Sequence, residues 1–279
     1  MLAIGDYSLA SLDAQDFALD GGAMFGVVPK TMWGSVAPAD ALNRVRLSAR
    51  LLLISGDSRH ILVDTGMGTA WPEKLRTIYD VSPFRLHDEL QRHGVHPEEI
   101  TDVILTHLHF DHAGGAYRLD GDRLEPLFPD ACFYLQEENW RQASAPNPKE
   151  KVSYNRAFVE ALGRQKHLRL LDGETRLFKG ITLLPTNGHT RGQQMVKISD
   201  GLQTLLYCGD LIPSSAHIPL PWVTGYDIEP LRVIEEKSTL LRQAALERWI
   251  LFFGHDPVHA AATVRLDEKG VVLERFIDL

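Results

Sequence analysis

The sequence predicts an α/β fold in which two mixed sheets are covered by helices, within one domain spanning residues 1–279. Short apolar runs rich in β-branched and aromatic residues alternate with segments whose apolar residues recur at helical spacing. The chain has 279 residues, which is enough to bury a single large core. Hydrophobic residues make up 44% and charged residues 24%, so the composition excludes a disordered chain.

Along the chain, we expect alternating strands and loops as far as Phe84. Beyond this point four segments have the periodicity and the end signals of helices. Two proline-containing stretches, 146–148 and 219–221, are expected to be surface loops. The end of the chain is expected to form a hairpin of residues 262–266 and 271–277. The four predicted helices are residues 85–93, 136–145, 153–164 and 229–245.

The strongest chemical signal is a short run that contains His107, His109, Asp111 and His112 directly after an apolar stretch. Imidazole and carboxylate are ligands that borderline divalent ions such as zinc prefer. Two histidines at His-x-His spacing project their rings to the same side of an extended segment. The run therefore predicts a metal site.

Three further candidate ligands follow apolar, strand-like runs in the same way. His189 follows residues 181–184, and Asp210 and His255 occupy equivalent places after their own runs, 205–207 and 250–253. Where strand ends converge in a sheet flanked by helices, residues distant in sequence meet in one cleft. We therefore expect these side chains to lie beside the first run.

Five ordered motifs give the chain a resemblance to the metallo-β-lactamase superfamily, and the likeness covers nearly the whole sequence. The resemblance implies a four-layer αββα sandwich of two mixed sheets flanked by helices. The motifs are Asp64-Thr65-Gly66, the His-x-His-x-Asp-His run at 107–112, Gly188-His189-Thr190, Gly209-Asp210 and Gly254-His255-Asp256.

The resemblance also implies a dinuclear metal centre. One metal would be bound by His107, His109 and His189, and the other by Asp111, His112 and His255, with Asp210 bridging them. Zinc is the expected metal, with manganese, iron and cobalt as alternatives. Asp64 is expected to orient the metal-binding loops and not to bind metal itself.

Such a centre implies hydrolysis, in which a metal-bridging hydroxide attacks an ester-type bond. Asp111 is expected to pass a proton to the leaving group while also serving as a ligand. A non-catalytic metal-binding module is the alternative outside the enzymes. It is disfavoured because none of the seven ligand positions is lost.

Within the superfamily, residues 20–30 followed by Trp33, together with 217–219 and 225–227, resemble a branch of quorum-quenching N-acylhomoserine lactone lactonases and methyl parathion hydrolase-like enzymes. A lactone is therefore the expected small-molecule substrate. Tyr226 is expected to hydrogen-bond a lactone oxygen, and His217 to contact substrate from an overhanging loop. An apolar wall around the substrate, or alternatively part of the core, is expected from Met24, Phe25, Trp33 and Trp222.

Other substrates remain alternatives. An aryl ester or organophosphate would suit the same branch. A glyoxalase II-like thioesterase is disfavoured because only a short tail follows His255. Class B β-lactamases most often lack a carboxylate matching Asp210, and flavodiiron proteins carry Glu at the position of His109, so antibiotic hydrolysis and redox chemistry are disfavoured as well.

The net charge of −8 and the pI of about 5.8 give no general attraction to nucleic acid or anionic membranes. No secretion signal or long apolar run is recognisable, so a cytoplasmic location is expected. Cys132 and Cys208 are expected to be buried thiols, with a Cys208 thiolate ligand as the alternative. Packing of the apolar segment 24–33 against a second copy predicts a homodimer. Ordinary surface or packing roles are expected for His60, His87, His93, His96, His167 and His259.

Overall fold

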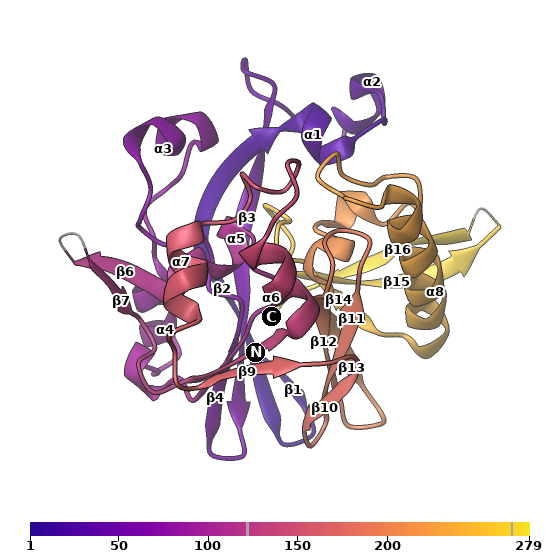
Figure 1. The fold of residues 1–279 in the computed structure, drawn as a ribbon. Helices are drawn as coiled ribbons and strands as arrows, with labels where there is room; N and C mark the ends of the chain where they lie inside the picture. The colour runs from indigo at the N-terminus through magenta and orange to yellow at the C-terminus, as the bar shows by residue number, and fades with distance from the viewer. Residues whose placement is uncertain (121–122, 269) are drawn as a thin grey trace.

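The computed structural model describes residues 1–120, 123–268 and 270–279, in which two seven-stranded sheets pack face to face (Figure 1). The first sheet has the order β1-β2-β3-β4-β5-β8-β9. Its first four strands pair antiparallel, and β4, β5, β8 and β9 pair parallel. The strands are β1 (Leu2–Ile4), β2 (Tyr7–Asp20), β3 (Arg44–Gly56), β4 (Arg59–Val63), β5 (Asp102–Ile104), β8 (Cys132–Gln136) and β9 (Leu168–Leu171).

The second sheet follows the chain in sequence, from β10 to β16. All neighbours pair antiparallel except β13 and β14, which are parallel. A separate hairpin consists of β6 (Tyr117–Asp120) and β7 (Arg123–Pro126). The strands of the second sheet are β10 (Thr175–Phe178), β11 (Ile181–Thr186), β12 (Gln193–Ser199), β13 (Thr204–Tyr207), β14 (Ile250–Phe252), β15 (Ala261–Asp267) and β16 (Gly270–Ile277).

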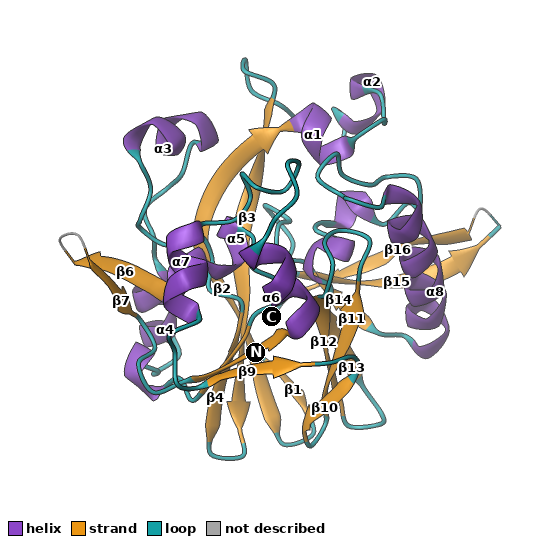
Figure 2. Ribbon diagram, in the orientation of Figure 1, coloured by secondary structure: helices purple, strands orange, loops and turns teal. Residues whose placement is uncertain are grey.

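Three hydrophobic clusters fill the spaces between the layers of this fold. The middle cluster lies between the sheets, where Ile61 and Ile104 of the first sheet belong to the same buried cluster as Ile198 and Leu205 of the second. A second cluster joins the outer face of the first sheet to α4 (Leu86–Arg92) and α7 (Arg156–Leu162). The third joins the second sheet to α8 (Pro230–Glu247). This arrangement confirms the predicted four-layer αββα sandwich (Figure 2).

The four predicted helices and the terminal hairpin are confirmed, with shifts of a few residues at their ends. They correspond to α4, α6 (Glu137–Ser144), α7, α8 and the pair β15–β16. The long helix α8 begins at Pro230, a residue whose fixed φ suits the first helical turn, and ends where Arg248 takes a left-handed φ of 56°.

The expectation of only strands and loops before Phe84 is wrong, because α1 (Gly21–Phe25), α2 (Lys30–Trp33) and α3 (Glu73–Tyr79) occur there. These helices are too short to give a periodic pattern, and the residues at their N-terminal ends determine where they begin. The Asp20 carboxylate accepts the Ala23 N–H at 2.9 Å, which caps α1, while α2 and α3 start after prolines. The remaining short helices are α5 (Phe110–Ala113), η1 (Pro97–Glu99), η2 (Gly114–Ala116), η3 (Gly209–Leu211) and η4 (Ser215–His217).

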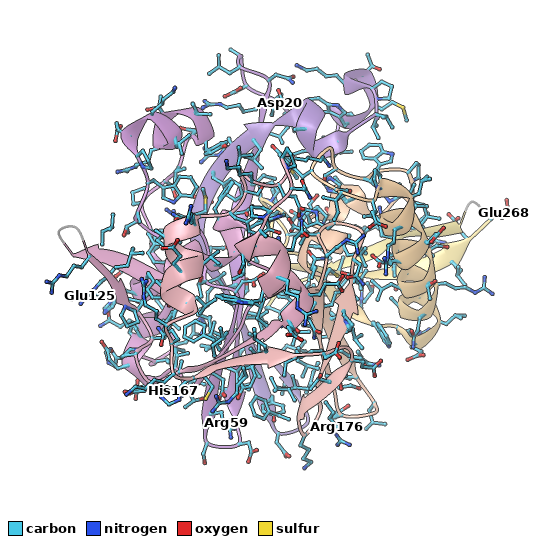
Figure 3. All side chains as sticks on the ribbon, in the orientation of Figure 1. Asp20, Arg59, Glu125, His167, Arg176 and Glu268 are labelled. Atoms are coloured by element: carbon cyan, nitrogen blue, oxygen red, sulfur yellow. The ribbon has the colours of Figure 1, made fainter. Side chains whose placement is uncertain are left out.

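The parallel pairs bring several strand ends to one edge of the sandwich. Figure 3 shows Arg59, at the start of β4, near the bottom of the view, and Asp20, at the end of β2, at the top. Because β5 is parallel to β4, and β14 is parallel to β13, the loops that follow each pair leave from the same edge. In the described part of the chain, no helix has both the length and the apolar character needed to cross a membrane.

The core between the sheets can be tested with two leucines that are close in sequence. Leu205 on β13 is 0% exposed and Leu202 in the preceding turn is 93% exposed. Leu205→Ala should lower the free energy of unfolding by about 2–5 kcal/mol, because it leaves a cavity between two packed layers. Leu202→Ala should change it by less than about 0.5 kcal/mol. Urea denaturation measures both, and equal midpoints for the two variants would contradict this assignment of the core.

Candidate metal centre

The strand-end loops bring the predicted ligands together. His107 and His109 follow β5, Asp111 and His112 lie on the short helix α5, and the other three follow the strands of the second sheet. Two groups of potential ligand atoms result, each with its atoms within 4.8 Å of one another. The groups are His107, His109 and His189, and Asp111, His112, Asp210 and His255.

Asp210 belongs to the second group but also faces the first. Its Oδ1 lies 3.3 Å from His112 Nε2 and 3.2 Å from His255 Nε2. Its Oδ2 lies 3.3 Å from His189 Nε2 in the other group. The side chain is therefore placed between the two groups, with one oxygen directed at each.

In His189, His112 and His255, a hydrogen bond on the side of the ring that points away from the other ligands determines which nitrogen carries the proton. The Nδ1 atom of His189 lies 2.7 Å from Asp227 Oδ1, and that of His112 lies 2.8 Å from Asp64 Oδ2. His255 Nδ1 lies 2.8 Å from the carbonyl oxygen of Ser48. Because carboxylates and carbonyls only accept, each Nδ1–H must donate, and in the neutral ring Nε2 is left with a lone pair.

Thr106 fixes His107 in the same way. Its hydroxyl lies 2.9 Å from both oxygens of Asp64 and donates its single proton there. The hydroxyl oxygen is then the acceptor for His107 Nδ1 at 3.0 Å. The Nε2 atom of His107 consequently also presents a lone pair to the interior of the site.

A divalent cation fits these residues. In the neutral rings, Nε2 of His107, His112 and His255 carries a lone pair. Even so, His255 Nε2 lies 2.9 Å from His112 Nε2, and His107 Nε2 lies 3.0 Å from His109 Nδ1. The buried oxygen Oδ1 of Asp210 has no hydrogen-bond partner. Facing lone pairs and an unpaired buried carboxylate oxygen are costly without a positive charge between them. The donor set of imidazoles and carboxylates is also the chemistry that zinc-like ions select.

The charges of the site agree with this interpretation. Burial lowers the pKa of His107 well below its usual value, and the neighbouring imidazoles of His112 and His109 add to the effect. Burial alone would raise the pKa of Asp210, but His112, His255 and His189 hold it well below the usual range. Asp210 is therefore ionised, as a metal ligand has to be, and its charge outweighs burial and raises the pKa of His112, His189 and His255. A metal that binds these imidazoles therefore has to displace protons from them.

Asp64 occupies the position expected for it. The residue follows β4 with a φ of 61°, and its Oδ1 accepts the Thr106 N–H at 2.7 Å. Its Oδ2 also accepts a hydrogen bond from the hydroxyl of Tyr207, at 3.1 Å. The carboxylate therefore connects the loop after β4, the loop after β5 and strand β13 behind His112, and it lies in neither ligand group.

Two carboxylates behind the ligands were not predicted. Asp227 holds His189, and only its place in the Gly225-Tyr226-Asp227 stretch gave it any prominence. Glu150 lies with Oε1 3.7 Å from Nε2 of His109, and it accepts hydrogen bonds from Thr190 and Tyr154. Burial favours the neutral acid, but hydrogen bonding and the His109 imidazole outweigh it and lower the pKa of Glu150 to about 2. No motif marks Glu150 in the sequence, because only the tertiary fold brings it to His109.

A cavity opens directly over the two ligand groups. Of the residues expected to contact substrate, Met24 and Tyr226 line it, and Asp111 lies at its floor with His109, His189, Asp210 and His255. Burial raises the pKa of Tyr226, so its phenol stays protonated and can donate a hydrogen bond. Sequence reasoning did not find the other lining residues, Leu19, Tyr79, Phe110, Val152, Ser153, Pro213 and Thr224.

The other predicted aromatic contacts lie behind this cavity wall. Phe25 stacks on Trp33 with ring centroids 5.2 Å apart, and Trp222 meets Phe25 edge-on at 5.7 Å. Phe25 and Trp33 are each 2% exposed, and none of the three is among the described residues that line the cavity. Phe25 and Trp33 therefore belong to the core with Met24, as the alternative expected, and Trp222 is half-buried against the same cluster.

The structure does not place His217 on an overhanging loop above the substrate. It is 1% exposed, its ring stacks on Phe25 at 4.9 Å, and both nitrogens have partners, Ser214 Oγ and the carbonyl oxygen of Met24, each at 2.8 Å. Burial lowers its pKa to about 4, so the ring is neutral. The short helix η4 turns the side chain inward, which corrects the expected substrate contact to a packing role against α1.

The two cysteines differ in burial. Cys208 is fully buried and lies in neither ligand group, and burial raises the pKa of its thiol. Cys132 is only half-buried, which corrects the expectation for this residue, because it starts an edge-proximal strand, β8. His60 contacts Ser55 and His259 stacks on Phe276, as ordinary packing residues do.

Comparison with known proteins agrees with this geometry. Residues 50–255 match the family model of the metallo-β-lactamase superfamily. A probable metallo-hydrolase of Mycobacterium tuberculosis is 28% identical over 221 residues, covering 67% of this chain, and the chain spans only 66% of that relative's length. An N-acyl homoserine lactonase of Bacillus cereus is 25% identical over 243 residues, covering 80% of this chain and 85% of the lactonase.

Among solved structures, a probable metal-dependent hydrolase from Staphylococcus aureus superposes with a TM-score of 0.90 at 28% identity, covering 100% of this chain and 99% of the other. The family match extends over the segment that contains all seven candidate ligands. The chain belongs to the metallo-β-lactamase superfamily.

Proposed function

We propose that this protein is a metal-dependent hydrolase with a dinuclear site, and that it opens a lactone by adding water across its ester bond. The observation that carries this proposal is the Asp210 carboxylate, which faces one imidazole group with each oxygen at the floor of a cavity. His107, His109 and His189 would hold one ion, and Asp111, His112 and His255 the other, with Asp210 shared between them. When bound, divalent ions such as zinc supply Lewis acidity that polarises a carbonyl group and activates water.

The protein's own groups would orient the substrate and move the proton. The Tyr226 phenol, kept protonated by burial, would donate a hydrogen bond to a substrate oxygen. The oxygen of water adds to the carbonyl carbon, the ring C–O bond breaks, and the ring oxygen becomes a hydroxyl group. The Asp111 carboxylate, at the cavity floor, would carry the proton from water to that departing oxygen.

The walls of the cavity favour a substrate with one polar and one apolar end. Asp111 and Asp210 line the cavity together with the candidate ligand imidazoles, and Leu19, Met24, Phe110 and Val152 give the same lining an apolar part. An N-acyl lactone has this character, because its ester would face the floor and its acyl chain the apolar sides. The similarity to the lactonase of Bacillus cereus supports the same substrate class.

The substrate class is tested by a panel of compounds. The metal-loaded protein should hydrolyse an N-acyl homoserine lactone with a higher kcat/KM than an aryl ester, a phosphotriester or a glutathione thioester. Ring opening releases acid and can be followed by pH-stat titration, with metal content measured on the same sample. Preferential cleavage of the thioester or the phosphotriester would contradict the lactone assignment, and two bound metals without any turnover would favour the non-catalytic alternative.

The proton-transfer role of Asp111 predicts a loss of turnover in Asp111→Asn. The amide keeps the shape of the side chain but cannot carry the proton, so kcat should fall about 10²–10⁴-fold. Because Asp111 is also a candidate ligand, metal content has to be measured alongside kcat. A variant that keeps two metals and full turnover would rule out this role.

The hydrogen bond from His189 to Asp227 predicts weaker metal binding in Asp227→Asn. The amide accepts less strongly and does not support the required ring orientation, so affinity at the His189 site should fall about 10–100-fold. Competition with a chromogenic chelator measures this change without any substrate. Asp256→Asn is a matched control, because this buried aspartate accepts hydrogen bonds from Ser215 and the backbone and contacts no imidazole in the described residues. Unchanged affinity in Asp227→Asn would show that Asp227 does not orient the ligand.

A further inference from the structure

One wall of the cavity is formed by a segment without helix or strand. Residues 219–227 lie within the connection between η4 and α8 and include Thr224 and Tyr226, which line the cavity. The segment ends at Asp227, whose carboxylate accepts both the His189 Nδ1–H and, at 2.8 Å, the Thr224 N–H. The position of this segment therefore sets both a cavity wall and the orientation of a candidate ligand.

Lys237 on α8 contacts this segment from inside the protein. Its side chain is 0% exposed, and Nζ donates to the carbonyl oxygens of Trp222 at 2.9 Å, Pro219 at 3.1 Å and Leu220 at 3.4 Å. No carboxylate of the described residues lies within ion-pair distance of Nζ, so the carbonyl dipoles are its partners. Burial lowers the pKa of Lys237 to about 7, and in the protonated form its ammonium group has three hydrogens, one for each of these carbonyls.

Lys149 contacts the same segment from the solvent side. It lies in the loop between α6 and α7, and its Nζ donates to the carbonyl oxygen of Tyr226 at 3.0 Å and to that of Asp227. The two lysines thus satisfy five carbonyl oxygens of one short segment from two different elements. Hydrogen bonds from a charged donor are roughly twice as strong as those between neutral groups.

We propose that Lys237 and Lys149 are positioning residues that hold residues 219–227 against the cavity. Apart from these lysines, the segment is attached to neighbouring elements by the hydrogen bond between Asp227 and His189, by the packing of Val223, and by backbone bonds such as that from Gly225 N–H to the Ala23 carbonyl oxygen at 2.7 Å. Without the Lys237 side chain, the carbonyl oxygens of Leu220 and Trp222 would lose this donor, whereas that of Pro219 keeps the Trp222 N–H at 3.0 Å. Without the Lys149 side chain, the carbonyl oxygens of Tyr226 and Asp227 would lose theirs, and either loss would loosen the segment. The Tyr226 phenol and the Asp227 carboxylate would then lose their fixed positions.

Lys149→Met provides the primary test, because Lys149 is exposed and its replacement should not prevent folding. Lys151→Met is the matched control, since Lys151 is also exposed, lies two residues away and has no side-chain hydrogen bond or ion pair among the described residues. Hydrogen exchange followed by mass spectrometry should show amides of residues 222–228 exchanging about tenfold faster or more in Lys149→Met. The control should match the wild type, and peptides from β13 and α8 should be unchanged in both variants.

Lys237→Met tests the inner contact and should accelerate the same amides. If this variant fails to fold, Lys149→Met decides the question alone. The prediction for catalysis rests on the proposed lactonase function: KM for the lactone should rise several-fold in Lys149→Met, with a smaller change in kcat. Exchange is independent of turnover, so it still tests the positioning role if no lactone is cleaved. Exchange rates in residues 222–228 that equal those of Lys151→Met would overturn the proposal.

Discussion

The close approach of imidazole nitrogens around a single carboxylate is the constraint on which the rest of this structure depends. The Nε2 atoms of His112 and His255 face each other at 2.9 Å, and both face Asp210, whose charge raises the pKa of both imidazoles despite their burial. Such an arrangement is unfavourable in a dry interior unless cations are bound within it. The protein therefore has to hold these side chains in place by contacts on their outer sides.

That support comes from both sheets and from the loops between helices and strands. Asp64 and Tyr207 connect the two sheets behind His112, and the carbonyl oxygen of Ser48 on β3 receives His255. Asp227 and Glu150, which lie on loops, reach His189 and His109. The rigid sandwich thus orients the ligands nearest the strands, while irregular segments orient those that border the cavity. Loops positioned by a rigid scaffold commonly carry function in this way.

The same division explains how the site acquires an apolar side. Met24 and Phe110 come from short helices near the strand ends. Phe25 and Trp33 form an aromatic stack in the same hydrophobic cluster as Met24, while Phe110 packs against Trp71 and Tyr79. His217 belongs to this supporting layer, because its ring stacks on Phe25 and its nitrogens are both occupied. The polar floor and the apolar sides therefore have separate structural origins.

The sequence by itself determined the strand-like runs, the longer helices and the spacing of the ligand residues, because these are local properties of the chain. Its resemblance to the superfamily implied the sandwich and the ligand set. Each of His107, His189, Asp210 and His255 could be placed because it follows a recognisable strand. Only the tertiary structure decided which side chains support the ligands and which line the cavity. Glu150 and Tyr79 carry no local signal, and His217 turned inward because the packing of α1 and η4 determines its direction. Contacts between residues distant in sequence arise from the folded arrangement, which no spacing rule contains.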